Sequence, residues 1–481
     1  MEIPLPTPAI APLWNSLMLD RQAPTSLQDQ IVAYFRAAAL SGRLPAGTRL
    51  PSSRELARDQ GLARITVVQA YDRLVAEGYV AARAGAGMYV ADDVAAAATP
   101  RPVASGTIDA PAMPQPEVPL PLTAGIPALD RFPWADWAKA GAAAQRGGPA
   151  GLLAYGDPGG AMELRAAIAN YVAVARGITC TPDQVIVISG AQQGIDLVAR
   201  TLLCPGDAVW FEEPGYVAGR SALAAAGLQV VPVPVDGDGM DVAIGLATRP
   251  DARLALVAPT HQYPLGATLS LGRRLALLDW AEGAGAWVVE DDYDGEYRYG
   301  GRPLTPLHTL DGGRRVLYLG TFSKVLAPGL RLGYLIVPPA LVGRFTDAKW
   351  MQDRGAPALT QQTLARFITQ GRLAAHVRRM RPLYRARRQA LLAALADHAA
   401  DVLDAAGNPD AGLHLVARLR APGDDGAIAQ IVLARGVKAA PLSAYYHGGA
   451  PAGGFVLGFA GTVEAAMDPA VRILATAIRR G

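Results

Sequence analysis

Hydrophobic positions between residues 25 and 90 follow first a helical and then a strand-like pattern. Apolar residues recur every three or four positions over 25–41, which predicts a helix that Thr25 or Ser26 caps and Gly42 ends. The patterns that follow predict a short helix, a turn, a longer helix and a two-stranded hairpin (52–60, 61, 65–77, 80–83 with 88–90). This order of elements is typical of a winged helix-turn-helix.

From about residue 121 onward, short apolar runs of strand length alternate with helical patterns. Three predicted strands are each followed by a predicted helix: 185–189 by 192–203, 208–211 by 216–226, and 254–258 by 271–283. Three further strands are predicted at 287–290, 316–320 and 332–337. Such alternation predicts an α/β domain with a mostly parallel sheet covered by helices. Later helices and strand-like runs such as Gly454–Ala460 predict a smaller α+β lobe over about 340–481.

Between these two patterns the sequence is rich in Ala, Pro, Ser and Thr and lacks periodicity. Repeated prolines are typical of a semi-rigid linker. We therefore expect a DNA-binding domain over 25–91, a linker over 92–120 and a large domain over 121–481.

Composition supports a globular protein of more than one domain, with 481 residues, 51% hydrophobic and 18% charged. The two cysteines, Cys180 and Cys204, lack metal-ligand spacing, so we expect reduced thiols and no metal site. The N-terminus lacks the features of a signal peptide, and no run of about eighteen apolar residues predicts a membrane span. These features favour a cytoplasmic location without membrane contact.

Charge is concentrated at the N-terminal end of the chain. Residues 25–90 carry eight arginines against five acidic residues, a balance of +3 that equals the net charge of the whole chain. A local basic surface on a neutral body favours binding of double-stranded DNA. The residues expected to contact base edges or phosphates lie at two helix starts and in the wing: Ser52, Ser53, Arg54, Arg64, Thr66, Gln69 and Arg83. A helical domain for protein contacts is the alternative.

Polar residues in the large domain cluster just after the predicted strands. Ligands bind at this edge of open α/β sheets. The candidates, in chain order, are Gly190, Ala191 and Gln192, then Tyr216, Gln262, Asp291, Tyr293, Thr321, Ser323 and Lys324, with Arg331 seven residues further on.

The most informative of these residues is Lys324, in Leu-Gly-Thr-Phe-Ser-Lys. A lysine among hydroxyl residues suits a Schiff base with pyridoxal 5′-phosphate (PLP), and Asp291 would keep the ring nitrogen protonated. Tyr216 can stack on the ring, and Tyr293 can hydrogen-bond its O3′ atom. The phosphate would take N–H groups from 190–192, hydroxyls from Thr321 and Ser323, and the fork of Arg331.

Two longer stretches identify relatives of the N-terminal domain. These are Leu50-Pro-Ser-Ser-Arg-Glu-Leu-Ala57 and the run from Arg64 to Leu74, followed by Glu77-Gly-Tyr-Val. They closely resemble the GntR-type winged-helix domain of bacterial transcription regulators, which bind operators as dimers. The resemblance implies that Arg54, Arg64 and Thr66 contact DNA.

Residues 121–481 resemble the fold-type I PLP enzymes, the aspartate aminotransferase superfamily, through the motifs around Asp291 and Lys324. Tyr155-Gly-Asp-Pro-Gly-Gly is similar to the family segment whose tyrosine reaches the phosphate of the neighbouring subunit. The resemblance therefore implies that Tyr155 binds the cofactor across a dimer.

Two departures weaken the expectation of efficient transamination. The family usually has Asn-Pro-x-Gly where this chain has Tyr263-Pro-Leu-Gly266, so Gln262 or His261 would replace the asparagine. It also presents an arginine for the substrate carboxylate in a late strand, where this chain has Val456.

The combination of a GntR-type domain, a linker and an aminotransferase-like domain resembles the MocR family of bacterial regulators. The resemblance implies a domain-swapped, head-to-tail homodimer that binds operator DNA and holds PLP on Lys324. Its effector is either PLP itself, as in regulators of vitamin B6 synthesis, or an amino compound. The missing arginine and the segment Pro441-Leu-Ser-Ala-Tyr-Tyr446 favour PLP. An active aminotransferase with an accessory DNA-binding domain, and a DNA-binding protein with an inert dimerisation domain, are the alternatives.

Overall fold

The computed structural model divides the chain into two compact units, Met1–Gln115 and Pro116–Gly481. It describes most of both units, namely residues 17–83, 85–94, 119–146, 150–300, 304–448 and 453–480. Most of the predicted linker, residues 95–118, lies outside the described residues. The domain boundaries at 91 and 120 therefore stay a prediction.

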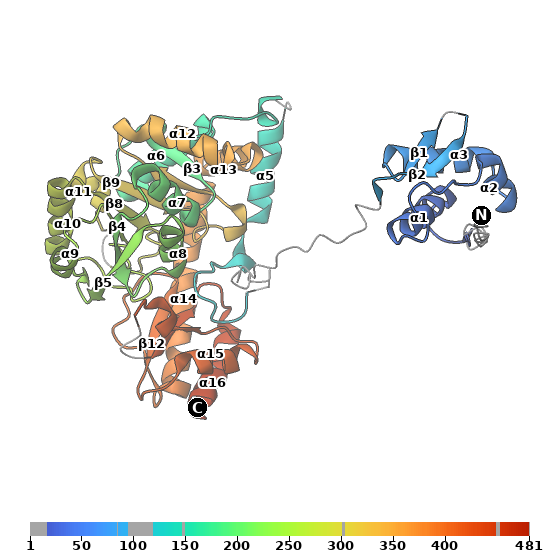
Figure 1. Ribbon diagram of the computed structural model, residues 1–481. Helices are drawn as coiled ribbons and strands as arrows, with labels where there is room; N and C mark the ends of the chain where they lie inside the picture. Colours follow the sequence, from blue (N-terminus) through green and yellow to red (C-terminus); the bar gives the residue numbers. More distant parts are fainter. Residues whose placement is uncertain are drawn as a thin grey trace, which may run out of the picture. The chain divides into compact units, whose positions relative to one another are not determined.

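Over residues 17–83 and 85–90, the first unit contains three helices and a hairpin, as the hydrophobic pattern predicts (Figure 1). The elements are α1 (Leu27–Leu40), α2 (Ser53–Asp59), α3 (Arg64–Ala76), β1 (Val80–Arg83) and β2 (Gly87–Val90). The side-chain oxygen of Ser26 caps α1 by accepting from the N–H of Asp29 at 3.1 Å. Buried residues from all three helices, among them Phe35, Leu56 and Leu74, form one core. The winged helix-turn-helix prediction is confirmed.

The second unit is built on an eight-stranded sheet of order β3-β10-β9-β8-β7-β4-β5-β6. The strands, in chain order, are β3 (Val185–Ile188), β4 (Ala208–Glu213), β5 (Gln229–Asp236), β6 (Gly239–Met240), β7 (Leu254–Val257), β8 (Trp287–Asp292), β9 (Val316–Thr321) and β10 (Gly333–Ile336). The five strands from β9 to β5 run parallel, whereas β10 is antiparallel to both of its neighbours. The sheet is mostly parallel, as predicted.

Helices cover both faces of this sheet, because successive residues of each strand point to opposite sides. Ile186 and Ile188 of β3 pack in a cluster with residues of α7 (Ala191–Leu202) and α8 (Val217–Ala225). Val185 and Val187 of the same strand belong to a different cluster with residues of α6 (Met162–Arg176) and α13 (Ala358–Thr369). The continuous apolar runs in the sequence therefore mark strands that are buried on both faces.

The smaller lobe begins later than residue 340, which corrects the sequence-based boundary. The helix α12 (Val342–Asp353) packs on α7, and α13 packs on α6 and α5 (Trp134–Gln145), so both belong to the large lobe. The small lobe contains an antiparallel sheet of order β11-β12-β14-β13 and two helices, α15 (Asp425–Leu433) and α16 (Glu464–Ile478). Its strands are β11 (Leu403–Asp404), β12 (His414–Leu419), β13 (Ala440–Pro441) and β14 (Gly454–Gly458). The long helix α14 (Arg372–Ala399) extends from the large lobe into the small one (Figure 1).

Candidate functional site

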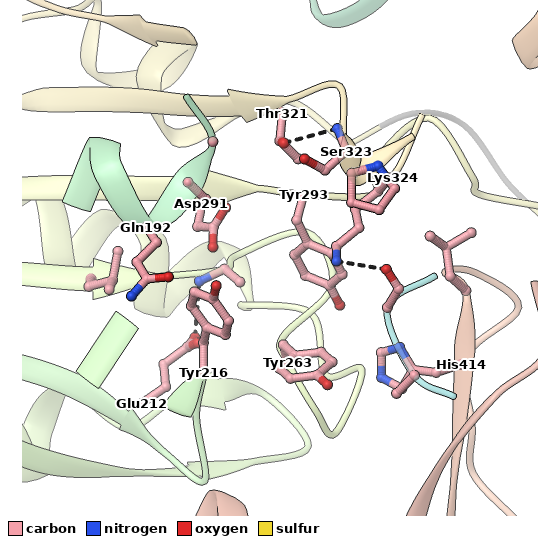
Figure 2. A pocket seen from close by; sticks show the side chains of 18 of the residues that line it. Gln192, Glu212, Tyr216, Tyr263, Asp291, Tyr293, Thr321, Ser323, Lys324 and His414 are labelled. Carbon is pink, nitrogen blue, oxygen red and sulfur yellow. Dashed lines mark hydrogen bonds between the residues drawn. The ribbon is translucent and has the colours of Figure 1, made fainter. Parts of the chain in front are cut away.

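A cavity of about 340 Å³ opens at the carboxyl ends of the central strands (Figure 2). All predicted cofactor residues line it except Tyr155 and Gln262. The predicted residues that the fold brings together here are Gly190, Ala191, Gln192, Tyr216, Asp291, Tyr293, Thr321, Ser323, Lys324 and Arg331. Parallel strands present their carboxyl ends at one edge of the sheet, and this explains the convergence.

Asp291, on β8, presents a carboxylate oxygen to this cavity without a partner. Its Oδ1 atom is buried and accepts no hydrogen bond from any described residue. Burial, and then the neighbouring Asp292, raise the pKa of Asp291 to about 7. A buried acceptor without a donor is costly, so the carboxylate suits a ligand that brings a proton to it.

Lys324 follows β9 and lies in the wall of the same cavity. Its Nζ atom donates a hydrogen bond to the carbonyl oxygen of Gly125 at 2.7 Å. Burial lowers the pKa of this amine, although the charges of Asp291 and Asp294 oppose that effect. A lowered pKa favours the neutral, nucleophilic form of a lysine.

Several groups suited to an anion meet at one side of the cavity. The helix α7 begins directly after Gly190, and no side chain caps its N-terminus. Arg331 lies beside this turn. Its Nη1 atom would be only 3.4 Å from a Cβ atom added to Gly190, whose φ is 118°. Thr321 accepts a hydrogen bond from the N–H of Ser323 at 3.1 Å. The helix terminus, hydroxyls and guanidinium together form a cradle for a phosphate.

The two aromatic residues predicted for the ring both line the cavity. Burial raises the pKa of Tyr216 to about 12, so its hydroxyl stays neutral. The hydroxyl of Tyr293 lies 2.9 Å from Nδ1 of His261, and that nitrogen is also 3.0 Å from Asp294. His261 therefore connects the hydroxyl of Tyr293 to the carboxylate of Asp294, and this contact fixes the position of Tyr293.

The structure does not place Gln262 among the residues that line the cavity. Its side chain is buried outside the cavity, where Nε2 donates to the carbonyl oxygens of Pro214 and Tyr263, each at 2.7 Å. The adjacent Tyr263 lines the cavity instead. A turn of the chain decides which of two neighbouring side chains faces the ligand, and periodicity cannot predict that choice.

Tyr155 lies outside this cavity and is 76% exposed. The guanidinium of Arg354 lies over its ring at 5.4 Å. Such exposure agrees with the expectation that Tyr155 serves a neighbouring subunit, which stays a prediction.

Three polar lining residues were missed by the sequence reasoning, namely Glu212, Tyr263 and His414. Glu212 is the penultimate residue of β4, and burial raises its pKa to about 8. Its position at the carboxyl end of a strand was a usable signal. His414 comes from β12 of the small lobe, and no local pattern could have identified it.

The pKa of Asp291 leads to a prediction about stability in the cofactor-free protein. Asp291 binds a proton more tightly in the folded chain, with a pKa of about 7 against an ordinary value of 3.8. The free energy of unfolding should therefore fall as the pH rises from about 4 to about 7, by up to about 4 kcal/mol from this group. Urea unfolding at pH 5 and pH 8 measures this change.

In that experiment Asp291→Asn should show a smaller loss of stability between the two pH values. The exposed Asp279, on α10 (Leu271–Ala284), provides the control variant Asp279→Asn, which should behave as the wild type. A wild-type stability that increases over this interval would contradict the prediction.

In the first unit, the predicted DNA contacts gather at the starts of α2 and α3. Arg54, Arg64 and Gln69 are exposed, and Nε of Arg64 donates to Oγ of Ser53 at 3.4 Å. Ser52 is the N-cap of α2, and its Oγ accepts from the N–H of Glu55 at 3.2 Å. The hydroxyl oxygen of Ser52 therefore caps α2 in the folded unit.

The remaining predicted contacts flank this surface. Thr66 is half-buried in the first turn of α3. The guanidinium of Arg83 lies 4.6 Å from the ring centre of Tyr89, so the wing holds it in place.

Comparisons with known proteins match both units. Residues 27–90 match the family described as bacterial regulatory proteins, gntR family, and residues 118–473 match aminotransferase class I and II. The chain is 39% identical to the probable rhizopine catabolism regulatory protein MocR of Rhizobium meliloti, over 96% of this chain and 95% of that protein. It is 34% identical to the pyridoxine biosynthesis transcriptional regulator PdxR of Corynebacterium glutamicum, over 92% of this chain and 94% of the relative.

A solved structure supports the same fold for the second unit. The kynurenine aminotransferase of Pyrococcus horikoshii superimposes with a TM-score of 0.69 at 29% identity, over 75% of this chain and 91% of that enzyme. Within the described residues, no helix is long and apolar enough to cross a membrane, and no group of His, Cys, Asp or Glu is arranged to hold a metal ion.

Proposed function

Because the chain belongs to the MocR family of GntR-type transcription regulators, we propose that it binds operator DNA and holds PLP in its aminotransferase-like domain. The winged helix would bind the operator, and occupancy of the large domain would alter that binding. A ligand shifts such an equilibrium only if it binds one conformation more tightly than the other.

The unpartnered Oδ1 atom of Asp291 carries the proposal for the cofactor. The protonated ring nitrogen of PLP is a donor that would satisfy this acceptor. Lys324 and the cradle at Gly190 and Arg331 lie in the same cavity, so an amine, an acid and an anion site are available to one small molecule. When bound, PLP supplies an aldehyde that reacts with primary amines.

The protein's own residues have distinct tasks in this proposal. Asp291 would hold a proton at the ring nitrogen, and Tyr216 would cover the ring. Arg331 and the N-terminus of α7 would hold the phosphate, and Nζ of Lys324 would supply the amine for covalent attachment.

A homodimer is part of the same proposal, and an exposed apolar patch supports it. Leu153, Tyr155 and Met351 are 85%, 76% and 83% exposed, and Trp350 lies at 6.4 Å from the ring of Tyr155. Exposed apolar residues in such numbers usually mark a protein interface. A second copy of the chain would cover them and bring Tyr155 to the partner's cofactor.

Operator binding by the full-length protein tests the proposal. The DNA is the region upstream of the protein's own gene, and binding is measured by fluorescence anisotropy with and without PLP at fixed salt. We expect specific binding whose affinity changes on addition of PLP or of an amine together with PLP. Equal binding to this region and to unrelated DNA would contradict the proposal.

A second candidate is an active aminotransferase, because Lys324 and Asp291 lie in the same cavity of a fold shared with such enzymes. Repeated turnover of amino donors with 2-oxoglutarate would favour the enzyme. Binding of an amine without turnover would favour the regulator.

A further inference from the structure

One end of the cavity is lined by residues that carry no charge. Figure 2 shows Gln192 and Asp291 on one side of Tyr293, and His414 on the other. The ring of Tyr263 lies 5.1 Å from that of His414, Leu413 precedes His414 in the chain, and Ala124 and Gly125 also line the cavity. We call these five residues the distal end.

None of the five residues of the distal end is a cation, and the amine beside it, Nζ of Lys324, is the group that binds PLP in the proposed function. Among the lining residues of the described chain, only Lys324 and Arg331 carry a full positive charge. Arg331 lies against Gly190, in the phosphate cradle. Nζ of Lys324 donates to the carbonyl oxygen of Gly125, the charges of Asp291 and Asp294 act to raise its pKa, and its own charge helps to lower the pKa of His414.

His414 is neutral as well. Its Nε2 atom lies 2.9 Å from the carbonyl oxygen of Pro264, which can only accept, so Nε2 carries the hydrogen. Burial lowers the pKa of this imidazole to about 4. Its Nδ1 atom is then an acceptor, and no described residue donates a hydrogen bond to it.

An apolar cluster closes the wall behind the distal end. Val416, Leu442 and Val456 are buried together, and Ala124 and Tyr445 pack against them. Val456 is fully buried in β14 within this cluster, so the region behind the lining residues is apolar. A carboxylate at this end would lose its hydration without gaining a counter-ion.

The distal end nevertheless has uncharged hydrogen-bonding groups. The hydroxyls of Tyr263 and Tyr445 lie 2.9 Å apart, and burial raises the pKa of both. When Tyr445 donates to Tyr263, the hydroxyl of Tyr263, which lines the cavity, keeps its own hydrogen as a donor. A hydroxyl donor from this pair and the Nδ1 acceptor of His414 match a ligand hydroxyl, which both donates and accepts.

We infer that the distal end takes the uncharged, hydroxyl-bearing tail of a small primary amine and rejects amino acids whose carboxylate would lie there. The inference rests on the proposed function, because the amine is taken to bind beside PLP and Lys324. It identifies the class of effector within that function.

Paired ligands that differ only in the tail test this inference. Full-length protein loaded with PLP is titrated with 3-aminopropan-1-ol and with 3-aminopropanoate, and then with trans-4-aminocyclohexanol and trans-4-aminocyclohexane carboxylate. Calorimetry gives the affinity and absorbance reports changes at the cofactor. We expect each amino alcohol to bind at least about tenfold more tightly than its matched acid. The acid would have to desolvate a carboxylate that has no partner, and the free energy of that desolvation corresponds to at least this factor in affinity.

The variant Val456→Arg should reverse this preference, and Val456→Leu should keep it. If the arginine variant does not fold, the comparison of alcohols with matched acids in the wild-type protein still tests the inference. Matched acids that bind as tightly as the alcohols, or the absence of binding by either alcohol to PLP-loaded protein, would overturn the inference. Failure to take up PLP at all would instead contradict the proposed function.

Discussion

Lys324→Ala is expected to yield a protein that does not retain PLP covalently and loses its yellow colour on dialysis. The reason is chemical, since Nζ of Lys324 is the only amine that lines the cavity within the described residues. Borohydride treatment followed by mass spectrometry should add one cofactor mass to the wild type and none to the variant. The cradle at Gly190 and Arg331 remains in the variant, so weak and reversible binding should persist.

Lys139→Ala is a matched control, because Lys139 is an exposed lysine on α5. This variant should keep both the colour and the added mass. If Lys324→Ala retained the full covalent mass while circular dichroism showed a native fold, another residue would hold the cofactor and the proposed site would be wrong.

The second large effect is expected at the winged helix, where Arg54→Ala combined with Arg64→Ala should abolish most operator affinity. Both guanidinium groups are exposed at helix starts, and neither forms an ion pair with an acidic residue in the described part of the chain. One lost arginine contact to a base or phosphate costs about 1–3 kcal/mol, so two should reduce affinity by about a hundredfold or more. Fluorescence anisotropy at several salt concentrations measures the loss and the change in salt dependence.

Arg58→Ala removes the same charge from the other end of α2. Arg58 is exposed and lies 3.3 Å from Asp59, so its loss should change operator affinity only slightly. The two outcomes separate specific contacts from the general effect of net charge. A similar loss of affinity in both variants would contradict the assignment of the starts of α2 and α3 as the DNA-contacting surface.

Local patterns were sufficient for the elements and for most of the candidate site. Periodicity predicted the three helices of the first unit, and apolar runs predicted the buried strands from β3 to β10 except β5 and β6. The strand β5 was missed because Pro232 and Pro234 resemble loop residues, although both are exposed beside buried valines. Motifs directly after strands were informative because parallel strands end at one edge.

Contacts between distant segments were decided by the tertiary structure. The helices α12 and α13 have ordinary helical patterns, and only packing assigns them to the large lobe. The sequence around 260–266 could not show that Tyr263 faces the cavity while Gln262 turns away, because the turn sets that orientation.

The amino-acid sequence by itself determined the two kinds of unit, the covalent lysine proposed at 324 and its acidic partner at 291, because each depends on residue type and position within one local segment. Only the tertiary structure decided that His414 and Tyr445 of the small lobe meet Tyr263 of the large lobe. That meeting depends on how two lobes pack across nearly two hundred residues of chain, as the Tyr263–Tyr445 separation of 182 positions shows. Side-chain packing over such separations leaves no periodic trace in the sequence.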